Sequence, residues 1–452
     1  MRAKTQSVTN RLSGYEVPPV PESRSAHGSV RRIANIPNAG SAAMVVAANS
    51  GDHPLLEKFL GQLQVVSRSE FQHTIDCPTY EPNQRLLIRS RGEIVAHIRI
   101  IPRDLRFGES TISSYHLTEL CVLPEFRQAG CMRLLLAAVR QRAATNRIAL
   151  ITTDSNRPEI LRRMGWASIP TGTNVTTSPH SLLGSLEEMN ASDPKTQWKE
   201  KYEIRPLRFV DQPFMAELYS ETAHRTFGMC ERSRKDWLWL MSRRGFDRAL
   251  VAVKPATCTT PETIVGYCLL RANQVVELIS DSRHALSMLP LLRRAAADVL
   301  ERGVHSIVIM ANSAPDLELD GFRSVDIDTS MAACVPSAYY FMKLMKAELG
   351  AQALRRGASP ESKIGLISGT ETLSLQVTKS KLKLKRNEQA RSRIQVSPSM
   401  MTQLALGCID ANGPHDAEEL SATTKLASDV ARCIFAKRRF LKIPLEDLAT
   451  LE

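Results

Sequence analysis

The chain has 452 residues, of which 43% are hydrophobic, and it carries a formal net charge of +12. This length predicts about three domains. There is no run of about 20 uninterrupted apolar residues, so we expect no membrane span and no membrane partner. The nine cysteines form no Cys-x-x-Cys pair, which argues against a metal site and a disulfide framework. We therefore expect a metal-free protein of a reducing cytoplasm.

The positive charge is spread along the chain and forms no single stripe interleaved with aromatic residues. We therefore expect no nucleic acid partner, although a basic surface suits a cofactor that carries several phosphates. The densest basic run, KSKLKLKRNEQARSR, starts with period-two alternation and indicates the solvated face of a sheet. Residues 1–42 contain basic residues but no apolar signal-like segment, so they predict a disordered tail.

The hydrophobic pattern from residue 84 predicts the order strand, strand, strand, helix, strand, helix. QRLLIRSRGEIVAHIRIIP is typical of a hairpin, and SSYHLTELCVL indicates a third strand. The turn PEFRQAGCMRL then leads into the helix LLLAAVRQRAATN, the buried strand RIALITTD and a helix that ends in LRRMGW. This order indicates a compact α/β unit with a mixed sheet.

The same order returns in the second half of the chain. ETIVGYCLL, QVVELIS, LLRRAAADVLERG and HSIVIMANS repeat three strands and the helix, so that Glu277 matches Glu119 and Gly321 matches Gly165. A period this long indicates a duplicated domain rather than a solenoid. The second copy has DSRHALSMLPLL in place of the glycine-bearing turn. Only the first copy is therefore expected to hold a phosphate there.

These patterns predict an α/β (α+β) protein with two tandem domains, each built on a mixed central sheet, and a C-terminal α+β domain. The first domain is expected over 43–184 and the second over 204–333. A polar linker is expected over 185–203 and the third domain over 334–452.

The strand LTELCVLP and the turn that follows it resemble the GCN5-related N-acetyltransferases. The turn Arg127-Gln128-Ala129-Gly130-Cys131-Met132 matches their pattern [QR]-x-x-G-x-[GA] except at Met132. The resemblance implies that backbone N–H groups of the turn hold the pyrophosphate of acetyl-CoA, and that the strand backbone holds the pantetheine and the acetyl carbonyl. Arginines suit the coenzyme phosphates. The implied coenzyme residues are Leu120, Cys121, Val122, Arg127, Gln128, Ala129, Gly130, Cys131, Met132, Arg133 and Asn156.

The whole chain resembles acetyltransferases of the enhanced intracellular survival type. These have an active first domain, a degenerate second copy and a domain like sterol carrier protein, and they typically carry a bulky aliphatic residue at the place of Met132. SMMTQLALGCI, LASDVARCIF and RRFLKIPLEDL carry the resemblance at the C-terminal end. The resemblance implies a homo-oligomer.

Acetyl transfer needs a base for the amine, a donor that polarises the thioester carbonyl, and an acid for the departing thiolate. The relatives use a tyrosine as the acid, but Leu161 stands in its place. They use a C-terminal carboxylate as the base, which makes Glu452 a candidate. Glu119 is a second candidate, and His116 and Tyr115 are further ones. A structural or solvent-facing Glu119 stays open, because the second copy keeps the same residue.

We therefore expect an acyltransferase that moves an acetyl group from acetyl-CoA to a primary amine of a small molecule or protein. A non-catalytic protein that binds coenzyme A or another partner is the alternative, and Leu161 favours it. In a third interpretation the C-terminal domain binds lipid, although its apolar residues are equally typical of an ordinary core.

Overall fold

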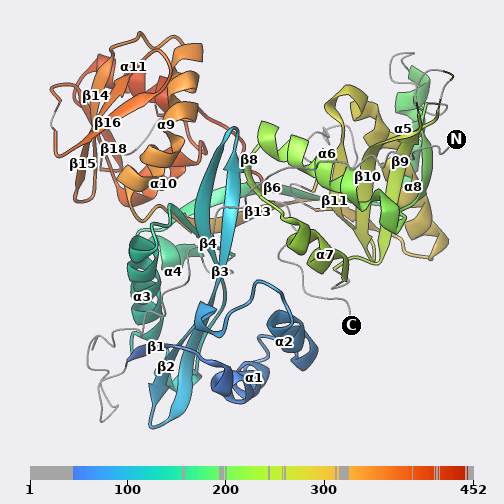
Figure 1. The fold of residues 1–452 in the computed structure, drawn as a ribbon, viewed down its shortest axis with the longest axis horizontal. Coiled ribbons are helices and arrows are strands. Elements are labelled where there is room, and N and C mark those ends of the chain that lie inside the picture. The colour runs from blue at the N-terminus through green and yellow to red at the C-terminus, as the bar shows by residue number, and fades with distance from the viewer. Residues whose placement is uncertain are drawn as a thin grey trace, which may run out of the picture.

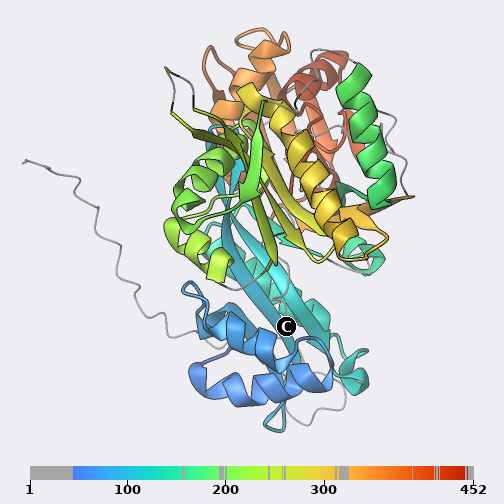
Figure 2. The same ribbon diagram turned by 90° about the vertical axis from the view of Figure 1, so that its right-hand side faces the viewer.

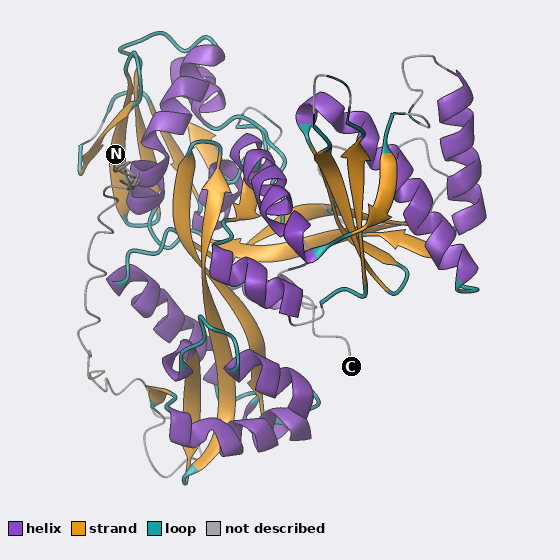
Figure 3. Cartoon of the chain, turned by 45° about the vertical axis from the view of Figure 1, so that its right-hand side comes forward, coloured by secondary structure: helices purple, strands orange, loops and turns teal. Residues whose placement is uncertain are grey.

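The structure is a computed structural model in which the chain forms three units (Figure 1). It describes residues 44–154, 158–192, 198, 201–242, 245–256, 258, 261–310, 313–314, 325–388, 390–411, 413, 416, 418–442 and 445. The predicted α/β (α+β) class is confirmed, since a 13-stranded mixed sheet and a separate five-stranded sheet are both flanked by helices (Figure 3).

The first unit contains the predicted hairpin, third strand, helix and buried strand. Its long hairpin is covered near its base by two helices whose apolar side chains form a common core with the strands (Figure 2). The elements are β1 (Val45–Ala47), α1 (His53–Gln62), α2 (Arg68–Ile75), β2 (Arg85–Ser90), β3 (Glu93–Phe107), β4 (Ser110–Val122), α3 (Cys131–Thr145), β5 (Leu150–Thr153), α4 (Pro158–Arg162), β6 (Ala167–Thr177) and α5 (Pro179–Ser192).

The second unit repeats this order, with β9, β10, β11, α8 and β12 in the places of β2, β3, β4, α3 and β5. Its elements are β7 (Glu203–Pro206), α6 (Gln212–Arg225), β8 (Phe227–Cys230), α7 (Arg234–Ser242), β9 (Arg248–Lys254), β10 (Thr263–Arg271), β11 (Gln274–Ser280), α8 (Met288–Glu301), β12 (Ile307–Ile309) and β13 (Val325–Cys334).

The two units exchange their last strands. β13 pairs with β5 of the first unit, as in Ala332 opposite Thr153, and β6 pairs with β12 of the second, as in Val175 opposite Ile309. β6 and β13 also pair with each other, which joins both sheets into one. The predicted domain limits therefore follow the chain order, whereas each sheet is completed by a strand from the other unit.

Helix α5 occupies the first part of the expected linker, so residues 185–192 are helical and that part of the prediction is wrong. Leu182 and Leu186 lie one helical turn apart and are fully buried. Glu187 on the same helix pairs with Arg293 of α8 at 3.0 Å. The polar outer face of this helix gave the segment its linker-like composition.

The third unit is the predicted α+β domain, and the tip of the β3–β4 hairpin reaches its core (Figure 1). The Phe107 ring lies 5.7 Å from that of Phe227 and 6.2 Å from that of Phe341. The elements are α9 (Ala338–Arg355), β14 (Lys363–Ser368), β15 (Glu371–Val377), β16 (Leu382–Arg386), β17 (Arg393–Val396), α10 (Pro398–Ala405), β18 (Leu420–Ala422) and α11 (Lys425–Ile434).

After α11 the chain returns to the first two units. The Phe440 ring lies 6.1 Å from that of Phe107, and the Leu441 N–H donates to the Phe227 carbonyl at 2.7 Å. Leu445 is fully buried in the core of the second unit. Within the described ranges, every helix is too short or too polar to cross a bilayer.

Candidate active site

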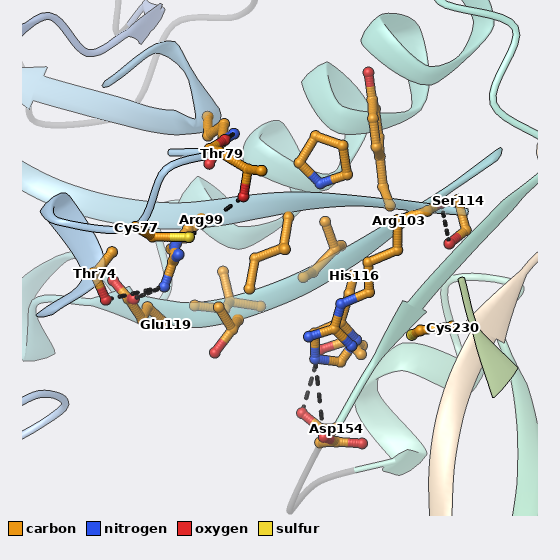
Figure 4. A pocket seen from close by; sticks show the side chains of 18 of the residues that line it. Thr74, Cys77, Thr79, Arg99, Arg103, Ser114, His116, Glu119, Asp154 and Cys230 are labelled. Atoms are coloured by element: carbon orange, nitrogen blue, oxygen red, sulfur yellow. Dashed lines mark hydrogen bonds and ion pairs between the residues drawn. The ribbon is translucent and has the colours of Figure 1, made fainter. Parts of the chain in front are cut away.

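A cavity of about 1900 Å³ lies between the first and second units. Strands β3 and β4 form one wall and the α1–α2 region forms another. Residues of α6 and α7 line the side toward the second unit. Figure 4 shows Thr74, Arg99 and Glu119 together in one part of this cavity and His116 beside Asp154 in another.

Strands β4 and β5 separate along the cavity. Their pairing runs from Ser114 opposite Leu150 to Leu117 opposite Thr153 and then stops. On its other side β4 stays paired with β3 as far as Val122. The strand edge from Leu120 to Val122 therefore lines the cavity without a neighbouring strand among the described residues, and such an edge offers backbone donors and acceptors to a ligand.

The turn after β4 ends at Gly130, which is the N-cap residue of α3 and has a left-handed φ of 79°. No side chain caps this helix, so the N–H groups of its first turn remain available for an anion. A Cβ atom at Gly130 would meet nothing within 4 Å, which leaves room for a ligand. Arg127 and Met132 line the cavity, while Met132 also packs against the apolar core of the unit.

The other residues predicted to bind the coenzyme also lie at the turn or at the start of α3. Gln128 and Ala129 lie in the turn, and Cys131 and Arg133 lie in the first turn of α3. The Ala129 N–H donates to the Phe126 carbonyl at 3.0 Å and is not available to a ligand.

The corresponding turn of the second copy is filled by the chain itself. Asp281 begins that turn, and its carboxylate accepts the Arg283 N–H at 2.8 Å and contacts the Arg283 guanidinium at 2.7 Å. Ser287, at the N-cap of α8, is fully buried. A carboxylate in this turn repels a phosphate, so the two turns differ in charge as well as in sequence.

Glu119 forms a bulge in β4 where the strand passes the separation point. Its φ is 54°, and the β3–β4 register shifts between His97 and Arg99. The carboxylate forms a salt bridge with Arg85 and a second with Arg99 at 3.3 Å. Burial opposes ionisation of Glu119, but Arg85 and Arg99 outweigh it, and the pKa of Glu119 lies below its ordinary value. The predicted base is thus better placed to hold the strand than to accept a proton.

Two further residues fix this bulge. The His97 Nδ1 lies 3.0 Å from the Glu119 carbonyl oxygen, and its Nε2 lies 3.1 Å from Arg85. Because of burial, which the charge of Glu119 opposes only in part, the pKa of His97 falls to about 4. The neutral ring therefore donates from Nδ1 to the carbonyl and accepts from Arg85 at Nε2. The Arg85 guanidinium, fully buried, also lies over the Phe71 ring at 4.9 Å.

His116 lies at the point where β4 and β5 separate. Its Nδ1 is 3.1 Å from the Thr152 hydroxyl, and its Nε2 is 3.9 Å from the Asp154 carboxylate. Lys442, from the returning C-terminal segment, contacts the same carboxylate at 2.5 Å. His116 is buried within the protein but lines the cavity, so its ring can exchange a proton with a bound substrate.

The remaining catalytic candidates differ in whether they can donate a proton or act as a nucleophile. The Tyr115 hydroxyl lies 2.6 Å from the Asn146 amide nitrogen. Leu161 lines the cavity and has no proton to donate. Burial raises the pKa of the Cys121 thiol to about 12, so this thiol is not a nucleophile. Asn156 and Glu452 lie outside the described residues. Within the described part of the chain no group of three or more His, Cys, Asp or Glu residues could hold a metal ion.

Arg85, His97 and Arg99 were not among the predicted site residues. His97 and Arg99 interrupt the apolar run of β3, and that interruption was their only signal, whereas Arg85 begins β2 after a polar stretch and gave none. A buried charge in an apolar strand needs a partner, but the sequence does not say which.

Residues 60–169 match the family model for the acetyltransferase (GNAT) domain. The match runs from the end of α1 to the start of β6 and so covers most of the first unit. The predicted acyltransferase class is thereby confirmed for the enzyme. No curated protein sequence matches the chain significantly.

Solved structures share the fold over most of the chain at low sequence identity. A GCN5-related N-acetyltransferase from Anabaena variabilis has 13% identity and a TM-score of 0.68. One from Kribbella flavida has 12% identity and a TM-score of 0.65, and Eis1 from Mycobacterium abscessus has 14% and 0.62. Each match covers 89% of this chain and 99% of the other.

Proposed function

We propose that this enzyme transfers an acetyl group from acetyl-CoA to a primary amine bound in the cavity between the first two units. The observation that carries this proposal is the separation of β4 from β5, which leads directly into the uncapped start of α3. A strand edge with unpaired backbone groups beside a helix N-terminus suits an amide-containing chain that ends in phosphates.

In this proposal the pyrophosphate lies at the N–H groups of Cys131, Met132 and Arg133, beside the Arg127 guanidinium. The open space at Gly130 admits the phosphates close to the backbone. The pantetheine amides pair with the backbone of Leu120–Val122. Asn156 stays a proposed contact.

The proposed reaction forms one C–N bond, breaks one C–S bond and moves one proton. The amine nitrogen attacks the acetyl carbonyl carbon, a backbone N–H of the β4 bulge stabilises the oxyanion, and the C–S bond breaks. We assign His116 as the base that takes the proton of the amine, with Asp154 stabilising the imidazolium. The leaving thiolate takes up the proton that His116 received from the amine, so the products are the amide and free coenzyme A, and His116 returns to its neutral form. Glu452 stays a second proposed base.

Calorimetry with acetyl-CoA and a thiol-release assay over a panel of amines test the proposal together. Gly130→Glu should weaken coenzyme binding at least about 100-fold, because it puts a carboxylate beside the phosphates. Gly92→Glu is the matched control, since Gly92 also has a positive φ and open space around its Cβ but lies at a hairpin turn. Wild-type affinity in Gly130→Glu would remove the proposed coenzyme site.

A non-catalytic protein that binds coenzyme A is the second candidate, because Leu161 supplies no acid and Glu119 is held by two arginines. Coenzyme binding without thiol release for any amine of the panel would favour it.

We also propose that the chain forms a homo-oligomer in which the second copy and the carrier-like C-terminal domain serve as a scaffold. The oligomer is supported by exposed apolar side chains of the second unit, with Phe209 77% and Val210 71% exposed. A monomeric mass by light scattering contradicts the oligomer.

A further inference from the structure

A group of three charged residues at the acetyl-binding strand has an unbalanced charge. Arg85 and Arg99 share one carboxylate, that of Glu119, and among the described residues neither guanidinium forms another salt bridge. His97, the fourth ionisable neighbour, is neutral at physiological pH because burial lowers its pKa to about 4. The group therefore carries one excess positive charge.

Arg99 is the member of this group that faces the cavity. Its side chain is 14% exposed, whereas that of Arg85 is fully buried, and it lines the cavity wall. Among the described residues its hydrogen-bond partners are the Thr74 hydroxyl at 3.2 Å and the Glu119 carboxylate at 3.3 Å, and both contact the same nitrogen, Nη1. Among the described residues its Nη2 has no partner. The guanidinium therefore keeps donors for a ligand in the cavity.

The second copy provides an internal control for this charge balance. Glu277 binds Arg232 through both carboxylate oxygens, at 2.8 and 2.6 Å, and accepts the Tyr267 hydroxyl at 2.6 Å. Among the described residues that group pairs one arginine with one carboxylate, and both side chains are at most 1% exposed. Glu277 is thus held by a single arginine, whereas Glu119 contacts two, so the second arginine is a feature of the first copy.

We propose that a substrate of this enzyme carries a carboxylate, and that Arg99 binds it in the part of the cavity lined by Thr74 and Glu119. The proposal rests on acetyl transfer in this cavity. An uncompensated buried charge is expensive, and a carboxylate that completes the pairing removes that cost only when the substrate is bound. Guanidinium and carboxylate match in shape and form strong paired hydrogen bonds.

Arg99 lies beside Glu119 of the strand proposed to bind the acetyl group, so both the amine and the acyl chain can place a carboxylate near it. The carboxylate can belong to the amine acceptor, as in an amino acid, or to the acyl chain of the coenzyme, as in succinyl-CoA. Both present the same chemistry to Arg99, and the experiment separates them.

Thiol release measured with matched substrates tests the proposal. One arm compares amino acids with their carboxamides as acceptors of acetyl-CoA, and the other compares succinyl-CoA with acetyl-CoA on a neutral amine. We expect the carboxylate substrate of one arm to have a kcat/KM at least about 10-fold higher, which is the magnitude of one charge-assisted hydrogen bond pair. Equal kcat/KM values in both arms overturn the proposal.

Variants of two arginines on β3 identify the residue responsible. Arg99→Met should lower kcat/KM for the carboxylate substrate at least about 10-fold more than for the carboxamide, which removes the preference, and Arg99→Lys should restore part of it. Arg106→Met is the matched control, because Arg106 lines the same cavity but already pairs with Glu231 at 3.3 Å. An equal loss for both substrates in Arg99→Met indicates a merely structural role and overturns the assignment.

Calorimetry separates failure of this proposal from failure of the acetyl-transfer function. Succinyl-CoA and acetyl-CoA are titrated into the protein, and N-acetylated amino acids and their carboxamides are titrated into the protein saturated with coenzyme A. A carboxylate preference that depends on Arg99, without turnover of any amine, keeps the site and rejects the acetyl-transfer function. Turnover with no preference in either assay does the reverse.

Discussion

The two copies of the acetyltransferase fold keep the same buried glutamate in different surroundings. Glu277 is fully buried and paired to Arg232, whose guanidinium carbon lies 3.8 and 4.7 Å from the ring centroids of Tyr219 and Trp237. Glu119 instead sits on a bulge with a positive φ beside the cavity, with two arginines. Both copies pair this glutamate with arginine, but the arginines lie on β2 and β3 in the first copy and before α7 in the second. Among the described residues, the open turn and the excess charge that suit ligands belong to the first copy.

The first prediction, with the largest expected effect, is that kcat depends on His116 of the first copy and not on the matching residue of the second. His116→Ala should lower kcat by about 100- to 10,000-fold, because general base catalysis contributes that much. Gln274 occupies the matching position of β11, so Gln274→Ala is the control and should leave kcat within about 2-fold. Steady-state thiol release measures both kcat values. An unchanged kcat in His116→Ala contradicts the assignment.

The second prediction compares how much the arginine partners of Glu277 and Glu119 contribute to the free energy of unfolding. Arg232→Met should lower the free energy of unfolding by about 3–5 kcal/mol, because it leaves the buried Glu277 carboxylate without its counter-charge. Arg99→Met should cost less than about 1 kcal/mol, because Glu119 keeps Arg85 and an excess buried charge is removed. Urea unfolding measures both free energies. Equal costs would mean that the two groups are electrostatically alike.

The third prediction is that His97, which lies beside Glu119, makes the stability of the protein depend on pH. The folded protein holds His97 neutral with a pKa of about 4, whereas an unfolded chain protonates histidine near pH 6.5. Between these values the unfolded state binds more protons, so stability is full above pH 6.5 and falls as the pH falls toward 4. The loss is on the order of 3 kcal/mol.

Urea unfolding at several pH values measures this loss. His97→Asn keeps a donor for the Glu119 carbonyl but does not titrate, so its stability should depend less on pH over this range. The same pH dependence in both proteins would contradict a neutral, buried His97.

The smallest effect concerns helix α5, which precedes the second copy and packs on α8. Glu187→Gln should change the free energy of unfolding by less than about 1 kcal/mol, because Glu187 and Arg293 are 40% and 45% exposed. Leu186→Ala in the same helix should cost about 2–5 kcal/mol, since Leu186 is fully buried. If the two substitutions cost the same, α5 is not packed on the second copy as described.

Local patterns in the sequence predicted the elements from β2 to α4, their repeats β10, β11, α8 and β12, and the duplication, but not the helices α1, α2, α6 and α7. The alternation in β2 and β3, the apolar face of α3 and the single glycine before it all depend on residues close in the chain. The same patterns placed Leu120, Arg127 and Gly130 around one strand and turn, where the structure has them.

Local patterns do not predict contacts between residues that are distant in the sequence. Alternation identifies β6 and β13 as strands but says nothing of their neighbours, so the strand exchange was not predicted. The same is true of Glu119, whose partners Arg85 and Arg99 lie on other strands and set whether its carboxylate accepts a proton or holds the bulge. Helix α5 was missed because its polar residues outnumber the buried Leu182 and Leu186.

The central claim is that the first copy binds the coenzyme and the second does not. Isothermal titration of the full chain with acetyl-CoA measures this directly as a stoichiometry. We predict one site per chain, which Gly130→Glu removes. Two sites per chain, or one site that persists in Gly130→Glu, would contradict the difference between the two turns.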